Sequence, residues 1–315
     1  MTRLLGSEDL AGLVDAASRA LGIPQADIEK DIWVVEVLRS VFQPIAGARV
    51  VFKGGTSLSK AYGIIERFSE DVDLLIVADD GVGRGTLDRI LKDLPRRAAT
   101  ALGITGIREG GSETGVHRSE RLAYPAVHPD LGRVKPGVLL EMGVRGGPEP
   151  AETRMIRSYA ADWALSTSAA TLDDFEEFAP VALVALRPER TLIEKLGIVH
   201  HLASTFPDSA ARIPAAGRHV YDIFRLLGDD DVLAALLKDG IAATMAADAD
   251  RRSATNEWPF TPRPSRGFAT SPAFSDGPAA DVLAAALSEA TTLVWGAVPT
   301  YQEVVGRVRS AADVL

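Results

Sequence analysis

Hydrophobic positions follow two patterns along this chain, and each pattern predicts one kind of element. Apolar residues three or four positions apart predict helices, and short continuous apolar runs predict buried strands. The segment after Pro24, for example, keeps Ile28, Ile32 and Val35 on one helical face as it runs toward Val41. For the first half of the chain these patterns predict two helices before residue 42, a strand at 48–52, a helix at 57–66, a strand at 72–77, a helix at 84–102 and strand-like segments at 115–128 and 137–144.

The second half of the chain has mainly helical periodicity. The stretch Gly146-Gly147-Pro148-Glu149-Pro150 is the clearest break in composition, and we predict a domain boundary there. Beyond it the patterns predict a strand at 181–186, helices from Pro188 and from about residue 218, a Pro- and Arg-rich loop at 257–278, and helices at 279–296 and 301–314. They favour an α/β domain over residues 1–148 and a mainly α-helical domain over residues 149–315.

The composition is that of a globular protein, with 46% hydrophobic and 24% charged residues among 315. The chain has no cysteine, which excludes disulfides, thiolate metal sites and a Cys nucleophile. Apolar runs fall short of the roughly 18–20 residues of a membrane span, and Glu8, Asp9 and Asp15 lie where a signal peptide would be apolar. We therefore expect a soluble, cytoplasmic protein. Its net charge of −9 argues against broad coating of nucleic acid, although residues 251–267 hold four Arg and one Glu.

The first candidate site is the turn Gly54-Gly55-Thr56-Ser57, which follows the strand predicted at 48–52. Two glycines let the backbone turn with its N–H groups exposed, and a helix starting at Thr56 adds further free N–H groups. Such an arrangement binds anions, above all phosphate. Lys60, one helical turn later, would add a positive charge. The alternatives are an ordinary tight turn and a solvated lysine.

The second candidate site is a pair of acids, Asp71 and Asp73, inside the strand predicted at 72–77. Alternate residues of a strand share a face, so both carboxylates project the same way and repel each other unless a cation lies between them. A hard divalent ion such as Mg²⁺ fits two carboxylates and phosphate oxygens. Glu141, in the apolar run VLLEMGV, is a third candidate metal ligand. Alternatively, Asp71 caps the strand and Glu141 lies at a strand edge.

A phosphate-binding turn, an Asp-x-Asp on the next strand and a later strand acid together form the pattern of polymerase-β-type nucleotidyltransferases. The stretches KGGTSLSKAYGIIERFSEDVDLLI, LEMGVRGGPEP, LRPERTLIEKLGIVHH and RHVYDIFRLL resemble the AbiEii/AbiGii-type nucleotidyltransferase toxins, including the MenT toxins, over about residues 25–230. The resemblance implies an α/β polymerase-β-type nucleotidyltransferase domain followed by a mainly α-helical domain, with the nucleotide in the cleft between them.

The resemblance also implies roles for four residues, because the family's acidic motif matches Asp71 and Asp73 and its later lysine and aspartate motifs match Lys195 and Asp222. Lys195 lies within an apolar helical segment, where it either reaches solvent or meets an anion such as a triphosphate. Its alternative is an internal salt bridge with Asp222. Asp222 itself could anchor Lys195, orient a hydroxyl or act as a general base.

As a member of that family, the protein would be an Mg²⁺-dependent toxin of a toxin–antitoxin system. It would transfer NMP from an NTP to an acceptor hydroxyl, the 3′ end of tRNA, and so block translation, and an antitoxin would neutralise it. Two rival functions stay open. The same chemistry could modify a small molecule or a protein, or the chain could be a nucleotide-binding regulatory module without turnover.

Ser69 is a candidate regulatory site, two residues before Asp71. A phosphate there would add about −1.5 to −2 charges beside the carboxylates, compete for Mg²⁺ and repel a triphosphate. Some toxins of the resembling family are paired with kinase-like antitoxins. The alternative is that Ser69 caps the loop or bonds a neighbouring amide.

Overall fold

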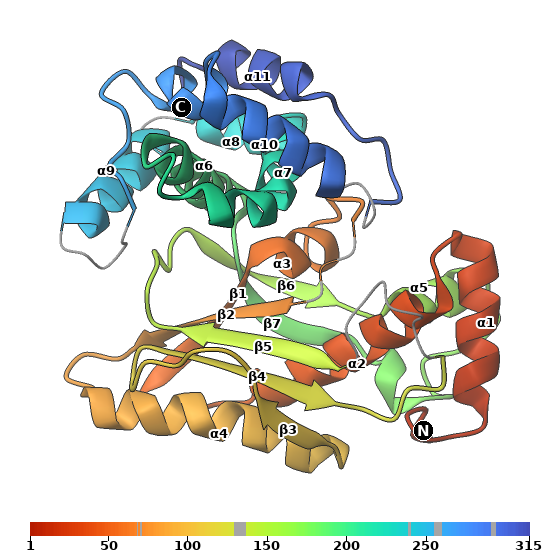
Figure 1. Cartoon of the computed structure of the whole chain (residues 1–315). Coiled ribbons are helices and arrows are strands. Elements are labelled where there is room, and N and C mark those ends of the chain that lie inside the picture. The colour runs from red at the N-terminus through yellow and green to blue at the C-terminus, as the bar shows by residue number, and fades with distance from the viewer. Residues whose placement is uncertain (68, 70, 129–136, 239–240, 255–259, 291–293) are drawn as a thin grey trace. The chain divides into compact units, whose positions relative to one another are not determined.

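The chain forms two compact units, each assembled from separate stretches of sequence. The sheet unit comprises Met1–Ala61, Phe68–Val144 and Ala151–Ala185, and the helical unit comprises Tyr62–Arg67, Arg145–Pro150 and Leu186–Leu315. Both are seen in a computed structural model, which describes residues 1–67, 69, 71–128, 137–238, 241–254, 260–290 and 294–315 (Figure 1).

Within its described residues the sheet unit contains one seven-stranded sheet with the strand order β3-β4-β5-β2-β1-β7-β6. The central strand β2 runs antiparallel to β1 and parallel to β5, and β1 runs parallel to β7. Val72, Leu74 and Ile76 of β2 are buried, as a strand with neighbours on both sides requires. The strands are β1 (Ala48–Lys53), β2 (Asp71–Ala78), β3 (Thr105–Arg108), β4 (His117–Ala123), β5 (Val138–Gly143), β6 (Ala151–Ile156) and β7 (Val181–Leu186).

The helices α2, α3 and α4 pack on this sheet, whereas α1 and α5 pack against α2 and against each other. The helix α4 runs beside β3 and β4, and α2 contacts both α4 and β5 (Figure 1). Pro24 is the N-cap of α2, and Gly103 ends α4 in the left-handed conformation. The described helices of this unit are α1 (Asp9–Leu21), α2 (Gln25–Val41), α3 (Gly54–Lys60), α4 (Arg84–Leu102) and α5 (Tyr159–Ser166).

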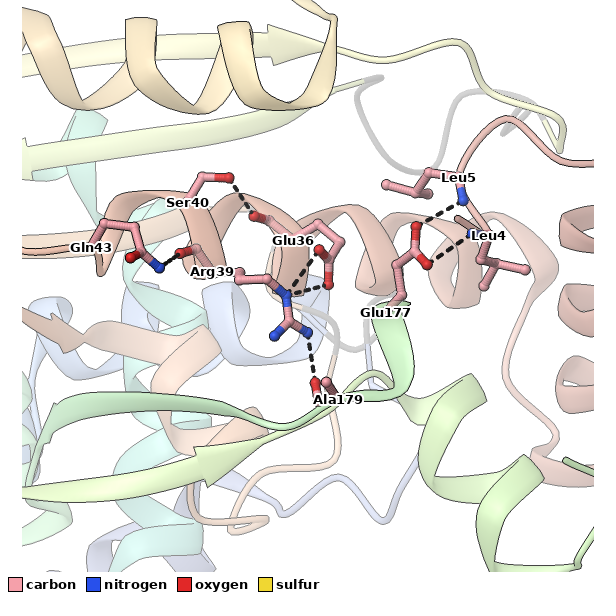
Figure 2. A network of polar contacts seen from close by, with 8 residues as sticks. All are labelled: Leu4, Leu5, Glu36, Arg39, Ser40, Gln43, Glu177 and Ala179. Carbon is pink, nitrogen blue, oxygen red and sulfur yellow. Dashed lines mark hydrogen bonds and ion pairs between the residues drawn. The ribbon is translucent and has the colours of Figure 1, made fainter. Parts of the chain in front are cut away.

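Polar contacts fix the N-terminal segment and α2 within the sheet unit. The carboxylate of Glu177 accepts hydrogen bonds from the backbone N–H groups of Leu4 and Leu5, at 2.8 and 2.9 Å (Figure 2). On α2, Arg39 pairs with Glu36 at 3.0 Å and donates to the backbone oxygen of Ala179 at 2.6 Å (Figure 2). The segment just before β7 is thereby tied both to the chain start and to α2.

Apart from an isolated bridge between Arg67 and Val294, the described secondary structure of the helical unit consists of helices. Among them α7 contacts α6, α10 and α11, and its residues Val220, Tyr221, Ile223 and Leu226 are buried. A capping box between Thr300 and Glu303 starts α11. The α-helices are α6 (Pro188–Ser204), α7 (Gly217–Leu226), α8 (Asp230–Leu236), α9 (Ile241–Ala254), α10 (Pro278–Glu289) and α11 (Tyr301–Ser310). In the part of the chain that the structure describes, no helix is both long and apolar enough to cross a bilayer.

Most predicted elements are confirmed, and the differences have local causes. The helix predicted at 57–66 is wrong beyond Lys60, because Gly63 takes the left-handed conformation (φ +67°), which cannot continue a right-handed helix. The helix predicted from residue 279 ends at Glu289. The domain boundary predicted between residues 148 and 149 differs from the observed division, because β6, α5 and β7 belong to the sheet unit.

Candidate active site

The three acids predicted as metal ligands lie in neighbouring positions of the sheet. On β2, Asp71 and Asp73 point to one face, because the intervening Val72 is buried on the other. The pairing of β2 with β5 places Glu141 directly opposite Asp73, and the pairing with β1 places Lys53 opposite Asp73 on the other side. Since directly opposite residues share a face, these side chains form one surface, which we call the acid face (Asp71, Asp73 and Glu141, with Lys53 beside them).

Gly54 brings the predicted phosphate-binding turn against the acid face. It follows β1 directly and has a φ of +76°, which favours glycine. A Cβ atom at this position would lie 1.9 Å from Oδ2 of Asp73. The carboxylate of Asp73 therefore occupies the space that any other side chain would fill, and the two motifs predicted from sequence meet at this point.

The first turn of α3 is tied to the start of β2. The hydroxyl of Thr56 donates to the backbone oxygen of Asp71 and lies 3.5 Å from that of Ser69. Ser57 is buried, and within the described residues its hydroxyl has no hydrogen-bond partner. A buried hydroxyl without a partner costs free energy unless a ligand reaches it. The phosphate-binding role of Gly54, Gly55, Thr56 and Ser57 stays a prediction, which the Ser57 hydroxyl supports.

Lys60 is engaged inside the sheet unit. Its Nζ lies 2.8 Å from Oδ1 of Asp31 on α2, and both side chains are 4% exposed. The ammonium group also lies 3.6 Å from the ring centroid of Tyr159, whose backbone N–H donates to Asp31 at 2.6 Å. Burial raises the pKa of Asp31, and the charge of Lys60 opposes that rise. The structure thus gives Lys60 a structural partner, and its predicted contact with a triphosphate stays a prediction.

Lys195 and Asp222, matched to family motifs by sequence, form a buried ion pair in the helical unit. Nζ of Lys195 on α6 lies 2.8 Å from Oδ2 of Asp222 on α7. Arg67 binds the same carboxylate with two donors, Nε to Oδ1 and Nη2 to Oδ2, both at 2.7 Å. Asp222 is 0% exposed and Arg67 4%. We call these three residues the cation cluster.

Electrostatics within the cation cluster favour an anchoring role for Asp222. Burial raises the pKa of the Asp222 carboxyl, but the charges of Arg67 and Lys195 outweigh burial and hold that pKa well below its usual value. A carboxylate with such a low pKa is a poor proton acceptor. His219, whose Nδ1 lies 3.4 Å from Nζ of Lys195, has its pKa lowered to about 3 by burial and by the positive charge of Lys195. His219 is therefore neutral near pH 7.

The chemistry of the acid face fits a magnesium ion held by two carboxylates. Asp71 and Asp73 share a face and offer hard oxygen ligands, and Mg²⁺ commonly takes one or two carboxylates together with phosphate oxygens and water. Among the described residues no group of three or more His, Asp or Glu side chains is arranged to hold a metal ion. The metal roles of Asp71, Asp73 and Glu141 stay predictions.

Sequence reasoning assigned no role to two charged residues of these clusters, Lys53 and Arg67. Lys53 ends β1 opposite Asp73, and Arg67 binds Asp222 across 155 residues of sequence. Arg67 lies just before the acidic motif in ERFSEDVD, which is the one signal that could have drawn attention to it. The regulatory role of Ser69 stays a prediction; the structure places this residue half-buried, with its backbone oxygen near the Thr56 hydroxyl.

Comparisons with known proteins bear on the whole chain. A solved structure of MenT4, a nucleotidyltransferase toxin from Mycobacterium tuberculosis H37Rv, is similar at 20% identity and a TM-score of 0.48, over 96% of this chain and 98% of that one. Among curated proteins none matches the sequence. The model of the nucleotidyl transferase AbiEii toxin family, of type IV toxin–antitoxin systems, matches residues 36–296, well over half of the chain. The chain therefore belongs to the AbiEii family of nucleotidyltransferase toxins.

Proposed function

We propose that this protein transfers a nucleoside monophosphate from an NTP to the 3′ end of tRNA, with Mg²⁺ held by Asp71 and Asp73. The observation that carries the proposal is the acid face with Gly54 against it. Two carboxylates point to one side of β2, a third stands opposite Asp73, and the adjoining turn leaves no room for a side chain. Metal ligands and a phosphate-binding turn are the parts that nucleotidyl transfer needs.

In the proposed reaction the acceptor hydroxyl oxygen attacks the α-phosphorus of the NTP. A new oxygen–phosphorus bond forms, the bond between the α-phosphorus and the bridging oxygen breaks, and pyrophosphate leaves with the bonding electrons. The hydroxyl proton passes to solvent or to a nearby base. A bound magnesium ion supplies positive charge to the phosphate oxygens, while the turn Gly54–Ser57 donates its N–H groups and the Ser57 hydroxyl to the phosphates.

The cation cluster supplies a second charged element. Asp222 divides one negative charge between two buried cations, so Lys195 keeps positive charge with which to attract an anion. We propose that this anion is the triphosphate of the nucleotide. Asp222 then serves as the anchor of Lys195, one of the three roles left open by the sequence, and its lowered pKa disfavours the role of general base.

Membership of the family supports an antitoxin partner. We propose tRNA as the acceptor, because transfer to its 3′ end would block aminoacylation and hence translation. The acceptor is tested directly by incubating the protein with each of the four labelled NTPs and Mg²⁺, in the presence of separate pools of tRNA, ribosomal RNA, small molecules and protein. Asp73→Asn is the matched control, because it keeps the size of the side chain and removes its charge.

The expected result is label on tRNA, resistant to removal of free nucleotide, and absent with Asp73→Asn. Digestion of the labelled tRNA would locate the added nucleotide at the 3′ end. Label only on small molecules or protein would replace the acceptor while keeping the chemistry. Tight binding of NTP without transfer to any pool would identify a nucleotide-binding module and overturn the proposal.

A further inference from the structure

The row of residues that crosses the acid face continues onto β4. The strands β4, β5 and β2 are neighbours in the sheet (Figure 1). Their pairing places Ser119 of β4 directly opposite Glu141, which itself lies opposite Asp73. Directly opposite residues share a face of the sheet, so Ser119 belongs to the same surface as the three acids. His117, two residues earlier on β4, lies on that face as well.

The two polar side chains of β4 contact each other. The hydroxyl of Ser119 lies 3.3 Å from Nε2 of His117, and Ser119 is 5% exposed. The backbone beside them is fixed to the end of β5, because the N–H of Val144 donates to the oxygen of Val116 at 3.0 Å. The other ring nitrogen of His117, Nδ1, has no hydrogen-bond partner among the described residues. In either neutral tautomer it can donate or accept one hydrogen bond.

Gly143 leaves the sheet surface beside His117 without a side chain. It lies directly opposite His117 on β5, is half-buried and does not have a positive φ. A Cβ atom on Gly143 would meet its nearest neighbours at 3.6 Å, the backbone oxygen of Val116, and at 4.0 Å, Cδ2 of the His117 ring. These are ordinary van der Waals distances, so the fold does not require glycine here. The glycine instead leaves an area of bare backbone, bordered by the imidazole, on which a ligand can lie.

In-line transfer gives the two sides of the acid face to different substrates. The turn Gly54–Ser57 follows β1, on one side of Asp73, whereas His117 lies on β4, on the other side. In-line displacement places the attacking oxygen and the leaving pyrophosphate on opposite sides of the α-phosphorus. With the triphosphate at the turn, as in the proposed reaction, the acceptor hydroxyl approaches from the side of β5 and β4.

We infer that His117 and Gly143 form the subsite for the terminal ribose of the RNA acceptor. Nδ1 of His117 forms a hydrogen bond with the 2′-hydroxyl, the ribose lies over Gly143, and Ser119 holds the imidazole ring in place. The 2′-hydroxyl can donate or accept a hydrogen bond, and it is the group that distinguishes RNA from DNA. Transfer to the adjacent 3′-hydroxyl leaves it available for this contact. The inference rests on the proposed function, because it places the nucleotide at the turn.

The test measures binding before chemistry. Two tRNA acceptor-stem hairpins carry ribose or 2′-deoxyribose in the last nucleotide, and their affinities are measured with a non-hydrolysable NTP and Mg²⁺ present. The wild type is compared with His117→Ala, Ser119→Ala and Gly143→Val. His128→Ala is the matched control, because the Nε2 atom of His128 lies 3.0 Å from Asp15 on α1 and the residue is outside this row. The same proteins then give kcat and the KM values for hairpin and NTP, per folded molecule.

We expect the wild type and His128→Ala to bind the ribose hairpin about tenfold more tightly than the deoxyribose hairpin, the difference that one hydrogen bond makes. His117→Ala should bind both hairpins equally, and Ser119→Ala should keep part of the preference. Gly143→Val should weaken binding of both, because its side chain fills the space over the strand, while its melting temperature stays near that of the wild type. The KM for the NTP should be unchanged in every variant.

Three results would overturn the inference. The first is a wild type that binds neither hairpin, or binds both equally. The second is a full preference for ribose in His117→Ala, which would make the imidazole merely structural. The third is a rise in the KM for the NTP alone, which would place His117 at the nucleotide. If the wild type prefers the ribose hairpin but transfers no label to it, the proposed function fails and the ribose-binding site stands.

Discussion

Two buried lysine–aspartate pairs, one in each unit, have the same length and opposite character. Lys60–Asp31 and Lys195–Asp222 both join at 2.8 Å. In the sheet unit, Asp31 faces one cation, and burial raises its pKa. In the helical unit, Asp222 faces Lys195 and Arg67, and their charges outweigh burial and lower its pKa. Distance alone therefore does not determine how a buried ion pair shifts the pKa of its carboxyl.

The difference lies in how charge is shared. Lys60 neutralises one carboxylate and covers the ring of Tyr159, so it stabilises the packing of α3 against α2 and α5. Asp222 is shared by two cations, which leaves positive charge at Lys195 for a ligand. From the sequence we predicted that both lysines contact a triphosphate, and in the structure Lys60 meets a carboxylate with one cation whereas Lys195 meets a carboxylate with two. The following predictions test whether the two lysines differ in function, beginning with the acid face.

Replacement of Asp73 by Asn should have the largest effect. We expect transfer to fall about 10³-fold, because the variant removes a charged ligand of the proposed metal, while the melting temperature holds or rises as repulsion from neighbouring carboxylates is relieved. Labelled-nucleotide transfer and calorimetry measure the two quantities. Near wild-type transfer in Mg²⁺ would refute the metal assignment, and Asp71→Asn provides an independent repeat.

Lys195→Met should mainly lower activity, whereas Lys60→Met should mainly lower stability. Lys195→Met should lower transfer about 10²-fold, with a modest loss of stability because Asp222 keeps Arg67 as its partner. Lys60→Met should destabilise the protein by about 3–5 kcal/mol, because it leaves the buried Asp31 without its cation. Denaturant unfolding and transfer per folded molecule distinguish the two.

A double-mutant cycle supplies the control for that comparison. Lys195→Met and Asp222→Asn are measured singly and together, both for melting temperature and for transfer. If the two residues couple strongly in stability while their effects on rate are independent, Lys195 has no role in binding phosphate. Lys195 and Lys60 would then both have a structural role.

A smaller effect is expected at Ser69, beside the acid face. Ser69→Glu should depress transfer about tenfold, because its negative charge repels the triphosphate and competes for Mg²⁺, and Ser69→Ala should remain largely active. Activity is measured at several Mg²⁺ concentrations, since the loss should be relieved as Mg²⁺ rises. Full activity of the Glu variant, with its mass confirmed, would exclude an electrostatic switch.

The smallest predicted effect is the change of stability with pH, which has opposite signs for His219 in the helical unit and Asp31 in the sheet unit. The pKa of His219 is lowered to about 3, so as the pH falls the unfolded chain takes up this proton before the folded chain does. The free energy of unfolding should therefore decrease as the pH falls from about 6.5 to 3, by at most ~1.4 kcal/mol per pH unit. The raised pKa of Asp31 makes its contribution to stability fall as pH rises above about 3.9. His219→Gln and Asp31→Asn should change the slope of unfolding free energy against pH in opposite directions. If both variants keep the slope of the wild type, these pKa shifts are wrong.

Periodicity predicted the parts of the site that lie within one element. The alternation in β2 placed Asp71 and Asp73 on one face, and Gly-Gly after an apolar run placed the turn. The position of Glu141 opposite Asp73 could not be predicted, because it depends on strand order. The same holds for Asp31 on α2, the partner of Lys60, which lies 29 residues away in sequence. It also holds for Asp222, the partner of Arg67, which lies 155 residues away. Local patterns specify faces of elements, whereas partners depend on packing.

The long separation in sequence between Arg67 and its partner Asp222 has a consequence for the protein as it is made. Arg67 is synthesised 155 residues before Asp222, a delay of about 8–30 seconds at ribosomal rates of ~5–20 residues per second. Throughout that interval the nascent chain carries Arg67 without the carboxylate that it binds in the folded protein. The cation cluster can therefore form only after Asp222 has been synthesised, and until then the positive charges of Arg67 and Lys195 lack their shared partner.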